Sequence, residues 1–180
     1  SSLVVIDLAT QALRNNRCDI AFAGGINLIL SPRLHAGLVQ LGALSPDGSC
    51  KTFSDAADGY GRGEGAGFIV LRRQEDAVAS ENFVWAEVLS SFVNHDGQSQ
   101  NLTAPNGLSQ RDLLSAALAE ANISPEKIDL IETHGTGTAL GDLVELSAIK
   151  DVYRKDSSRP LYLSAVKSRI GHLEAAAGVA

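Results

Sequence analysis

The sequence has no methionine, only two cysteines and no long hydrophobic run, and these absences exclude several classes of protein. Cys18 and Cys50 are too few for a disulfide framework or a cysteine-based metal cluster. This cysteine usage suits a reducing compartment, and we expect a cytoplasmic protein. No apolar stretch reaches the roughly 18–20 residues that a membrane-spanning helix requires. Because the initiator methionine is missing and both ends fall within helical patterns, we expect an internal piece of a longer protein.

Positive charge is also scarce. The chain has 15 Lys and Arg against 21 Asp and Glu, a net charge of −6, and no dense basic patch, which argues against a nucleic-acid-binding surface. Its four histidines are scattered, without a His-x-x-x-His pair, so the sequence predicts no metal site. With 180 residues, of which 44% are hydrophobic and 20% charged, the composition is that of a globular protein with a core.

Strand and helix patterns alternate along the chain, which predicts a parallel or mixed α/β sheet. Short apolar runs predict strands at 19–23, 68–71, 128–131 and 161–166, and an alternating pattern predicts another at 84–93. Periodic patterns predict helices at 3–13, 113–121, 142–153 and 173–180. A capping-box pattern from Ser109 to Asp112 is expected to begin the second of these helices. The polar stretch 72–82 is the best candidate for a seam between two halves.

Two histidines stand at the mouths of strand–turn–helix patterns, where open α/β sheets bind ligands. His134 heads the glycine- and threonine-rich turn 134–141, and His172 follows Gly171 after the last predicted strand. The glycines allow a ligand close to the backbone. An imidazole near a helix N-terminus tends to stay neutral, and its Nε2–H can then donate to a developing oxyanion. We therefore expect the fold to bring His134 and His172 together, although lone histidines are more often structural.

Two charged residues flank these histidines. Lys167 lies five residues before His172, and Glu145 follows the turn that His134 heads. They are either ordinary surface charges or a Lys–Glu pair that orders a pocket and biases nearby protonation states.

Nucleotide binding and cysteine catalysis within this chain are disfavoured. The glycine spacing in 134–141 is close to a dinucleotide-binding loop, but no acidic residue follows a strand about 20 residues later, as ribose binding requires. Cys18 and Cys50 lack a glycine-lined approach and an obvious base, so we expect both to be non-catalytic.

Several motifs in a fixed order resemble the β-ketoacyl synthases, and in particular the ketosynthase domains of type I or modular polyketide synthases. They are Asp58–Gly65, Asn94–Gly97, Leu102–Gly107, His134–Asp142 and Lys167–His172. The resemblance covers essentially the whole chain. It implies a thiolase-like α/β fold with αβαβα layers built from two related halves, incomplete here at both ends. Residues 1–73 would be the remainder of the N-terminal half, and residues 81–180 the first part of the C-terminal half.

The resemblance also implies a Cys–His–His site. Its members here would be two catalytic imidazoles, two site-organising charges and two hydroxyls that contact a phosphopantetheine arm, namely His134, His172, Lys167, Glu145, Thr136 and Thr138. The nucleophilic cysteine is expected just before Ser1, outside this chain, so the fragment alone is expected to be inactive. Arg169 departs from the family, which usually has asparagine at this place.

The implied reaction is a decarboxylative Claisen condensation in polyketide or fatty acid biosynthesis. The implied partners are an acyl carrier protein, which brings the phosphopantetheine, other polyketide synthase domains and a second copy in a homodimer. The domain itself would bind no cofactor. Two alternatives remain open. One is a non-elongating or decarboxylating relative, to which Arg169 gives some weight, and the other is a non-catalytic scaffold or interaction domain.

Overall fold

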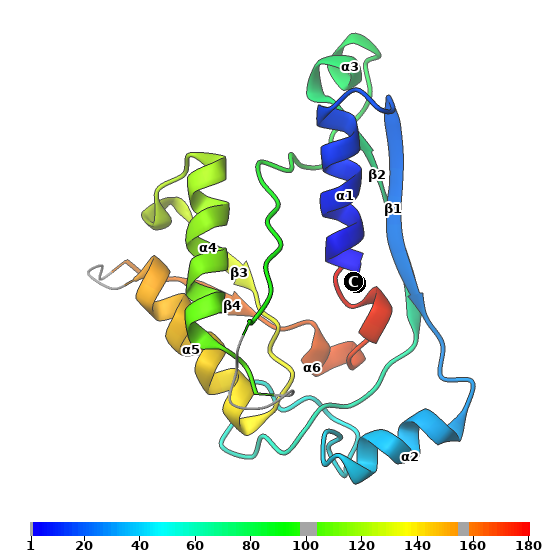
Figure 1. Ribbon diagram of the computed structural model, residues 1–180, viewed down its shortest axis with the longest axis vertical. Coiled ribbons are helices and arrows are strands. Elements are labelled where there is room, and N and C mark those ends of the chain that lie inside the picture. Colours follow the sequence, from blue (N-terminus) through cyan, green and yellow to red (C-terminus); the bar gives the residue numbers. More distant parts are fainter. Residues whose placement is uncertain (1, 98–103, 155–158) are drawn as a thin grey trace.

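The computed structural model describes residues 2–97, 104–154 and 159–180, so Leu102 and Thr103 of the predicted motif 102–107 lie outside the described residues. The chain forms an α/β structure with two small sheets (Figure 1). In one, β1 (Ile20–Asn27) pairs antiparallel with β2 (Gly65–Arg72). In the other, β3 (Leu130–Glu132) pairs parallel with β4 (Tyr162–Ser164).

The first sheet carries α1 (Ser2–Arg14) along one face, as Figure 1 shows. Its strand β1 runs on through Gly24 and Gly25, where the sequence predicted an end. Both positions in the strand require glycine. A Cβ on Gly24 would lie 2.2 Å from the Gly67 carbonyl oxygen, and a Cβ on Gly25 would lie 2.6 Å from the Ala175 carbonyl oxygen. Glycine at these two places therefore lets neighbouring backbone pack closely on the strand.

The second sheet is accompanied by two helices that pack against each other, α4 (Gly107–Ala121) and α5 (Ala139–Tyr153) (Figure 1). The predicted capping role of Ser109 is wrong. Asn106 caps α4 instead, since its side-chain oxygen accepts the Leu108 N–H at 3.0 Å, and the helix therefore begins earlier.

The described chain also contains three shorter helices, α2 (Pro32–Gln40), α3 (Gln74–Ala79) and α6 (Lys167–Ile170), and the 3₁₀ turn η2 (Glu174–Ala176). A further 3₁₀ turn, η1 (Pro125–Lys127), precedes β3. Every helix among the described residues is too short or too polar to cross a bilayer.

Two sequence predictions of regular structure are wrong. Residues 84–93 form no strand, because the described structure gives their backbone no neighbouring strand, and Trp85 is 92% exposed. Residues 173–180 form only η2 and not a longer helix. There Glu174 has a left-handed φ of 43°, and the Gly178 N–H donates to the Ser2 hydroxyl instead of to a helical carbonyl.

Candidate active site

The two predicted histidines lie together beyond the carboxyl ends of β3 and β4. Their ring centroids are 5.6 Å apart, and the ring planes are nearly perpendicular, at 87°. Because β3 and β4 are parallel neighbours, their carboxyl ends lead into the same edge of the sheet. The Thr133 N–H donates to the Ser164 carbonyl at 2.9 Å and holds the start of the His134 loop to β4. Both imidazoles can thus reach one small ligand.

The hydrogen bonds around His172 determine where its proton lies. The backbone N–H of Glu174 donates to His172 Nδ1 at 2.8 Å. A neutral imidazole that accepts at Nδ1 carries its proton on Nε2. The Tyr60 ring lies against the imidazole, with the centroids 5.1 Å apart. His172 is therefore arranged as a hydrogen-bond donor at Nε2.

Both imidazoles are held in the neutral form. Burial, together with the nearby His134 and Lys167, lowers the pKa of His172 from 6.5 to about 4. Desolvation by surrounding protein, with the positive charge of Lys167, also lowers the pKa of His134. Two neutral imidazoles with their ring centroids 5.6 Å apart form a site suited to a developing negative charge on oxygen.

Glu145 and Lys167 both lie at this site, but they do not form the Lys–Glu pair that was one of the two interpretations of the sequence. The Glu145 carboxylate reaches back from α5 and accepts the N–H groups of His134, at 2.5 Å, and Gly135, at 2.8 Å. Lys167 is buried, at 6% exposure, and none of the ion pairs in the described part of the chain joins it to Glu145. Glu145 therefore holds the loop through backbone N–H groups, while Lys167 supplies a buried positive charge.

The two predicted phosphopantetheine contacts lie on the same loop. Thr136 is buried, and its hydroxyl oxygen is 3.3 Å from that of Thr138. Thr138 is half-buried and directly precedes α5. The hydroxyl pair thus lies between His134 and the start of that helix.

Sequence reasoning missed Asp142, whose carboxylate connects two walls of the site. It is 4% exposed, and its oxygens accept the N–H groups of Phe53, at 2.7 Å, and Gly137, at 3.1 Å. The Gly59 N–H also donates to the Gly137 carbonyl at 3.0 Å. An acidic residue in the first turn of a helix was the available signal, but nothing in the sequence indicated its partner at Phe53.

The ion pair between Arg62 and Glu174 was also missed. Arg62 Nε lies 2.6 Å from Glu174 Oε1, and Arg62 Nη2 lies 2.9 Å from Oε2. The Arg62 side chain is 4% exposed and that of Glu174 is 22% exposed. The available signal was the glycine-rich motif 58–65, which contains Arg62, but nothing in the sequence indicated that this motif would lie beside His172.

The remaining candidates lie away from the histidines or lack ligands. No group of three or more His, Cys, Asp or Glu side chains in the described ranges could hold a metal ion. Cys50 is buried, and its sulfur accepts the Gly61 N–H at 3.3 Å.

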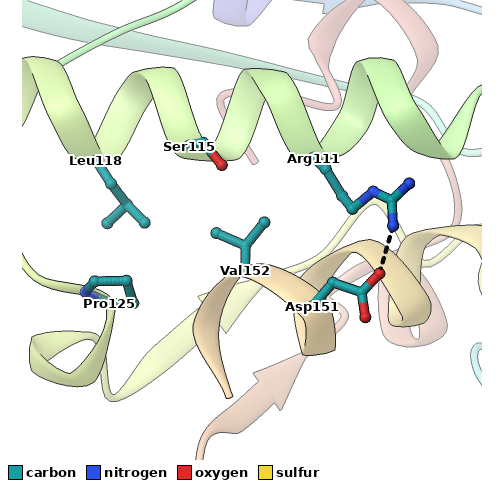
Figure 2. A pocket seen from close by; sticks show the side chains of 6 residues that line it. All are labelled: Arg111, Ser115, Leu118, Pro125, Asp151 and Val152. Atoms are coloured by element: carbon teal, nitrogen blue, oxygen red, sulfur yellow. Dashed lines mark hydrogen bonds and ion pairs between the residues drawn. The ribbon is translucent and has the colours of Figure 1, made fainter. Parts of the chain in front are cut away.

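A separate groove lies between α4, η1 and α5 (Figure 2). Its lining is Arg111, Ser115, Leu118, Pro125, Asp151 and Val152, with an Arg111–Asp151 ion pair of 2.7 Å.

Comparison with protein families matches both parts of the chain. Residues 1–77 match the family model of the beta-ketoacyl synthase N-terminal domain, and residues 85–180 match that of the C-terminal domain.

Curated relatives are similar over the whole chain. A phenolphthiocerol/phthiocerol polyketide synthase of Mycobacterium tuberculosis is 48% identical over 183 residues, which cover 100% of this chain and 10% of the relative. The spectinabilin polyketide synthase system protein NorA' of Streptomyces orinoci is 48% identical over 182 residues, covering 100% of this chain and 5% of the relative. The chain thus spans a tenth or less of the length of these relatives.

Solved structures share its fold. The ketosynthase from module 6 of the bacillaene synthase of Bacillus subtilis 168 superposes with a TM-score of 0.96 at 42% identity, covering 99% of this chain and 32% of that one. The oxazolomycin ketosynthase domain OzmH KS7 of Streptomyces albus JA3453 gives 0.95 at 38% identity, covering 99% and 31%.

Proposed function

Because the chain belongs to the β-ketoacyl synthase family and has its thiolase-like α/β fold, we propose that it serves as the ketosynthase of a longer polyketide synthase. The observation that carries the proposal is the pair of neutral imidazoles, 5.6 Å apart, with the proton of His172 directed to Nε2 by the Glu174 N–H. Such a pair fits the oxygen of a thioester that becomes an enolate.

The reaction begins when an acyl group moves from a carrier thioester to a cysteine sulfur, with release of the carrier thiol. We propose that this cysteine lies just before Ser1 in the longer protein, and that Cys18 and Cys50 are not nucleophiles. A malonyl thioester then binds on its carrier. Its carbon–carboxylate bond breaks, carbon dioxide leaves, and the electron pair forms an enolate. The enolate carbon attacks the acyl-cysteine carbonyl, the carbon–sulfur bond breaks, and the β-ketoacyl chain remains on the carrier.

In this reaction His134 and His172 donate to the thioester oxygen while negative charge develops there. Burial lowers the pKa of both imidazoles, and the buried positive charge of Lys167 adds to this effect. Glu145 holds the His134 loop through two backbone N–H groups. Thr136 and Thr138 supply hydroxyls for the phosphopantetheine arm of the carrier. No cofactor of the domain itself enters these steps.

The proposed setting is a homodimeric ketosynthase among other polyketide synthase domains in the cytoplasm, with an acyl carrier protein as substrate-bearing partner. Residues 1–73 would belong to the N-terminal half of the fold and residues 81–180 to the C-terminal half. The family-model boundaries at residues 77 and 85 support a division near this place.

The proposal is tested by product analysis on the full-length parent protein. It is incubated with an acyl thioester and malonyl-loaded acyl carrier protein, and the carrier is analysed by mass spectrometry. We expect a β-ketoacyl carrier extended by two carbons. Acetyl carrier without extension would indicate a decarboxylating relative, and an unchanged malonyl carrier would indicate a scaffold domain. Either result would contradict the proposal.

The acid limb of the pH profile is expected well below the ordinary histidine pKa. Since the pKa of His172 is lowered from 6.5 to about 4, its imidazole remains a neutral donor as pH falls through that interval. In the same interval the unfolded chain takes up a proton that the folded chain does not, so this histidine lowers the free energy of unfolding as pH falls. The measurement is kcat/KM for condensation against pH in the parent protein. An acid limb centred at 6.5 or above would contradict the assignment.

A further inference from the structure

The partly buried ion pair between Arg62 and Glu174 has a geometry that fixes the orientation of the carboxylate. Two N–H groups of the guanidinium meet the two carboxylate oxygens, at 2.6 and 2.9 Å, with 4% of the Arg62 side chain exposed. A two-pronged pairing of this kind fixes the direction of the carboxylate as well as its position. Glu174 is thereby tied to a segment far away in the sequence.

The backbone of Glu174 is strained at the place where it contacts His172. Its φ of 43° is in the left-handed region, which is unfavourable for a non-glycine residue and persists only where the surroundings enforce it. In this conformation its N–H donates to His172 Nδ1 at 2.8 Å. The side chain that pairs with Arg62 and the N–H that orients His172 thus belong to the same constrained residue.

The segment that carries Arg62 also holds His172 directly. The His172 N–H donates to the Gly61 carbonyl at 2.7 Å, and the Gly63 N–H donates to the His172 carbonyl at 2.9 Å. Residues 61–63 therefore fix the backbone of residue 172 and the side chain of residue 174 together. The distance between Glu174 N and His172 Nδ1 is then set by one rigid unit.

Resting on the proposed function, we propose that Arg62 and Glu174 are positioning residues for condensation. Their ion pair keeps the Glu174 N–H on His172 Nδ1 and so keeps the proton of His172 on Nε2. Without the pair, the N–H can move away and the imidazole can carry its proton on Nδ1. It would then present a lone pair to the thioester oxygen and oppose the enolate.

Several charges face His172, and they determine which variants are informative. Lys167 of α6 and His134 of the β3 loop favour its neutral form, while the Glu174 carboxylate favours its protonated form. Tyr60 contributes a ring contact. Glu174→Ala and Glu174→Gln remove the same negative charge, but only the glutamine can still accept a hydrogen bond from Arg62. A difference between the two variants therefore reports the hydrogen bond from Arg62 to the side chain of residue 174, and through it the position of the backbone N–H on His172 Nδ1, and not the charge.

The experiment compares these variants in the full-length parent protein, with Arg111→Ala as the control for losing an exposed ion pair remote from His172 (Figure 2). Acyl transfer onto the enzyme and condensation with malonyl carrier are measured separately. Glu174→Ala is expected to lower kcat for condensation about tenfold, as loss of a group that orients a functional side chain does, with acyl transfer unchanged. Glu174→Gln should recover most of this loss, and its acid limb should lie at lower pH than that of Glu174→Ala. Arg111→Ala should change neither step.

Equal slowing of acyl transfer and condensation in Glu174→Ala would show a merely structural role and overturn the inference. Identical kinetics and acid limbs in the alanine and glutamine variants would overturn it too. If His172→Ala abolishes condensation while Glu174→Ala leaves it intact, only the positioning role fails. If the wild-type parent forms no condensation product, the proposed function fails and the inference falls with it.

Discussion

Replacing His172 by alanine in the full-length parent protein is expected to lower the condensation rate about 10²–10³-fold, the usual effect of removing one oxyanion donor. The physical reason is that His172 is neutral and carries its proton on Nε2, and that its ring centroid lies 5.6 Å from that of His134. His134→Ala should have an effect of the same order. Acyl transfer to the nucleophile should continue, because the loss concerns charge that develops on the malonyl thioester. The measurement is single-turnover formation of β-ketoacyl carrier.

His35→Ala is the matched control, since it removes an exposed imidazole on α2 and should leave both steps unchanged. Condensation at the wild-type rate in both His134→Ala and His172→Ala would show that this pair of imidazoles does not carry the reaction and would contradict the proposed roles. Unchanged decarboxylation without extension would instead indicate that the imidazoles do not stabilise the enolate.

The second large effect is expected from Asp142→Ala. Removing this buried carboxylate leaves the N–H groups of Phe53 and Gly137 without their acceptors. Hydrogen bonds to a charged group contribute about 1.5–3 kcal/mol each, so the local free energy of opening should fall by about 3 kcal/mol or more. Condensation should fall by about 10²-fold, because a shift of the His134 loop by about an ångström misplaces the donor. Hydrogen–deuterium exchange of peptides 51–54 and 135–138 in the parent protein measures the opening.

Asp151→Ala provides the comparison on the same helix. Its carboxylate is exposed and pairs with Arg111 across the groove of Figure 2. We therefore expect Asp151→Ala to change the local free energy of opening by at most about 1 kcal/mol. Slow exchange of both loop peptides in Asp142→Ala would show that other contacts hold the loop. Asp142 would then have no positioning role.

The sequence predicted the meeting of His134 and His172 because each follows a strand pattern, and parallel strands bring their following loops to one edge. The α/β class and most helices were also predictable, because they depend on hydrophobic periodicity, which is a local pattern. By contrast, the strand expected at 84–93 needs a neighbouring strand, which periodicity alone cannot supply. A Lys167–Glu145 pair was one of two interpretations of these opposite charges, and in the structure the Glu145 carboxylate instead accepts backbone N–H groups.

The contacts that shape the site were hidden from the sequence because both partners are distant along the chain. Asp142 binds Phe53, and Glu174 binds Arg62. Neither pair leaves a periodic or spaced pattern, because its geometry follows from how segment 50–63 lies against both histidine loops. Glycine at position 137, with φ of 81°, and at 171, with φ of 76°, marked the places where such contact was sterically allowed. Which segment would fill those places depended on the whole fold.

A crystal structure of the complete ketosynthase with a non-decarboxylating malonyl thioester analogue would show which groups hold the thioester oxygen. We expect this oxygen at about 2.7–3.1 Å from Nε2 of both His134 and His172. A thioester oxygen held by other groups, with one or both imidazoles turned away from it, would rule out the proposed role of the imidazole pair.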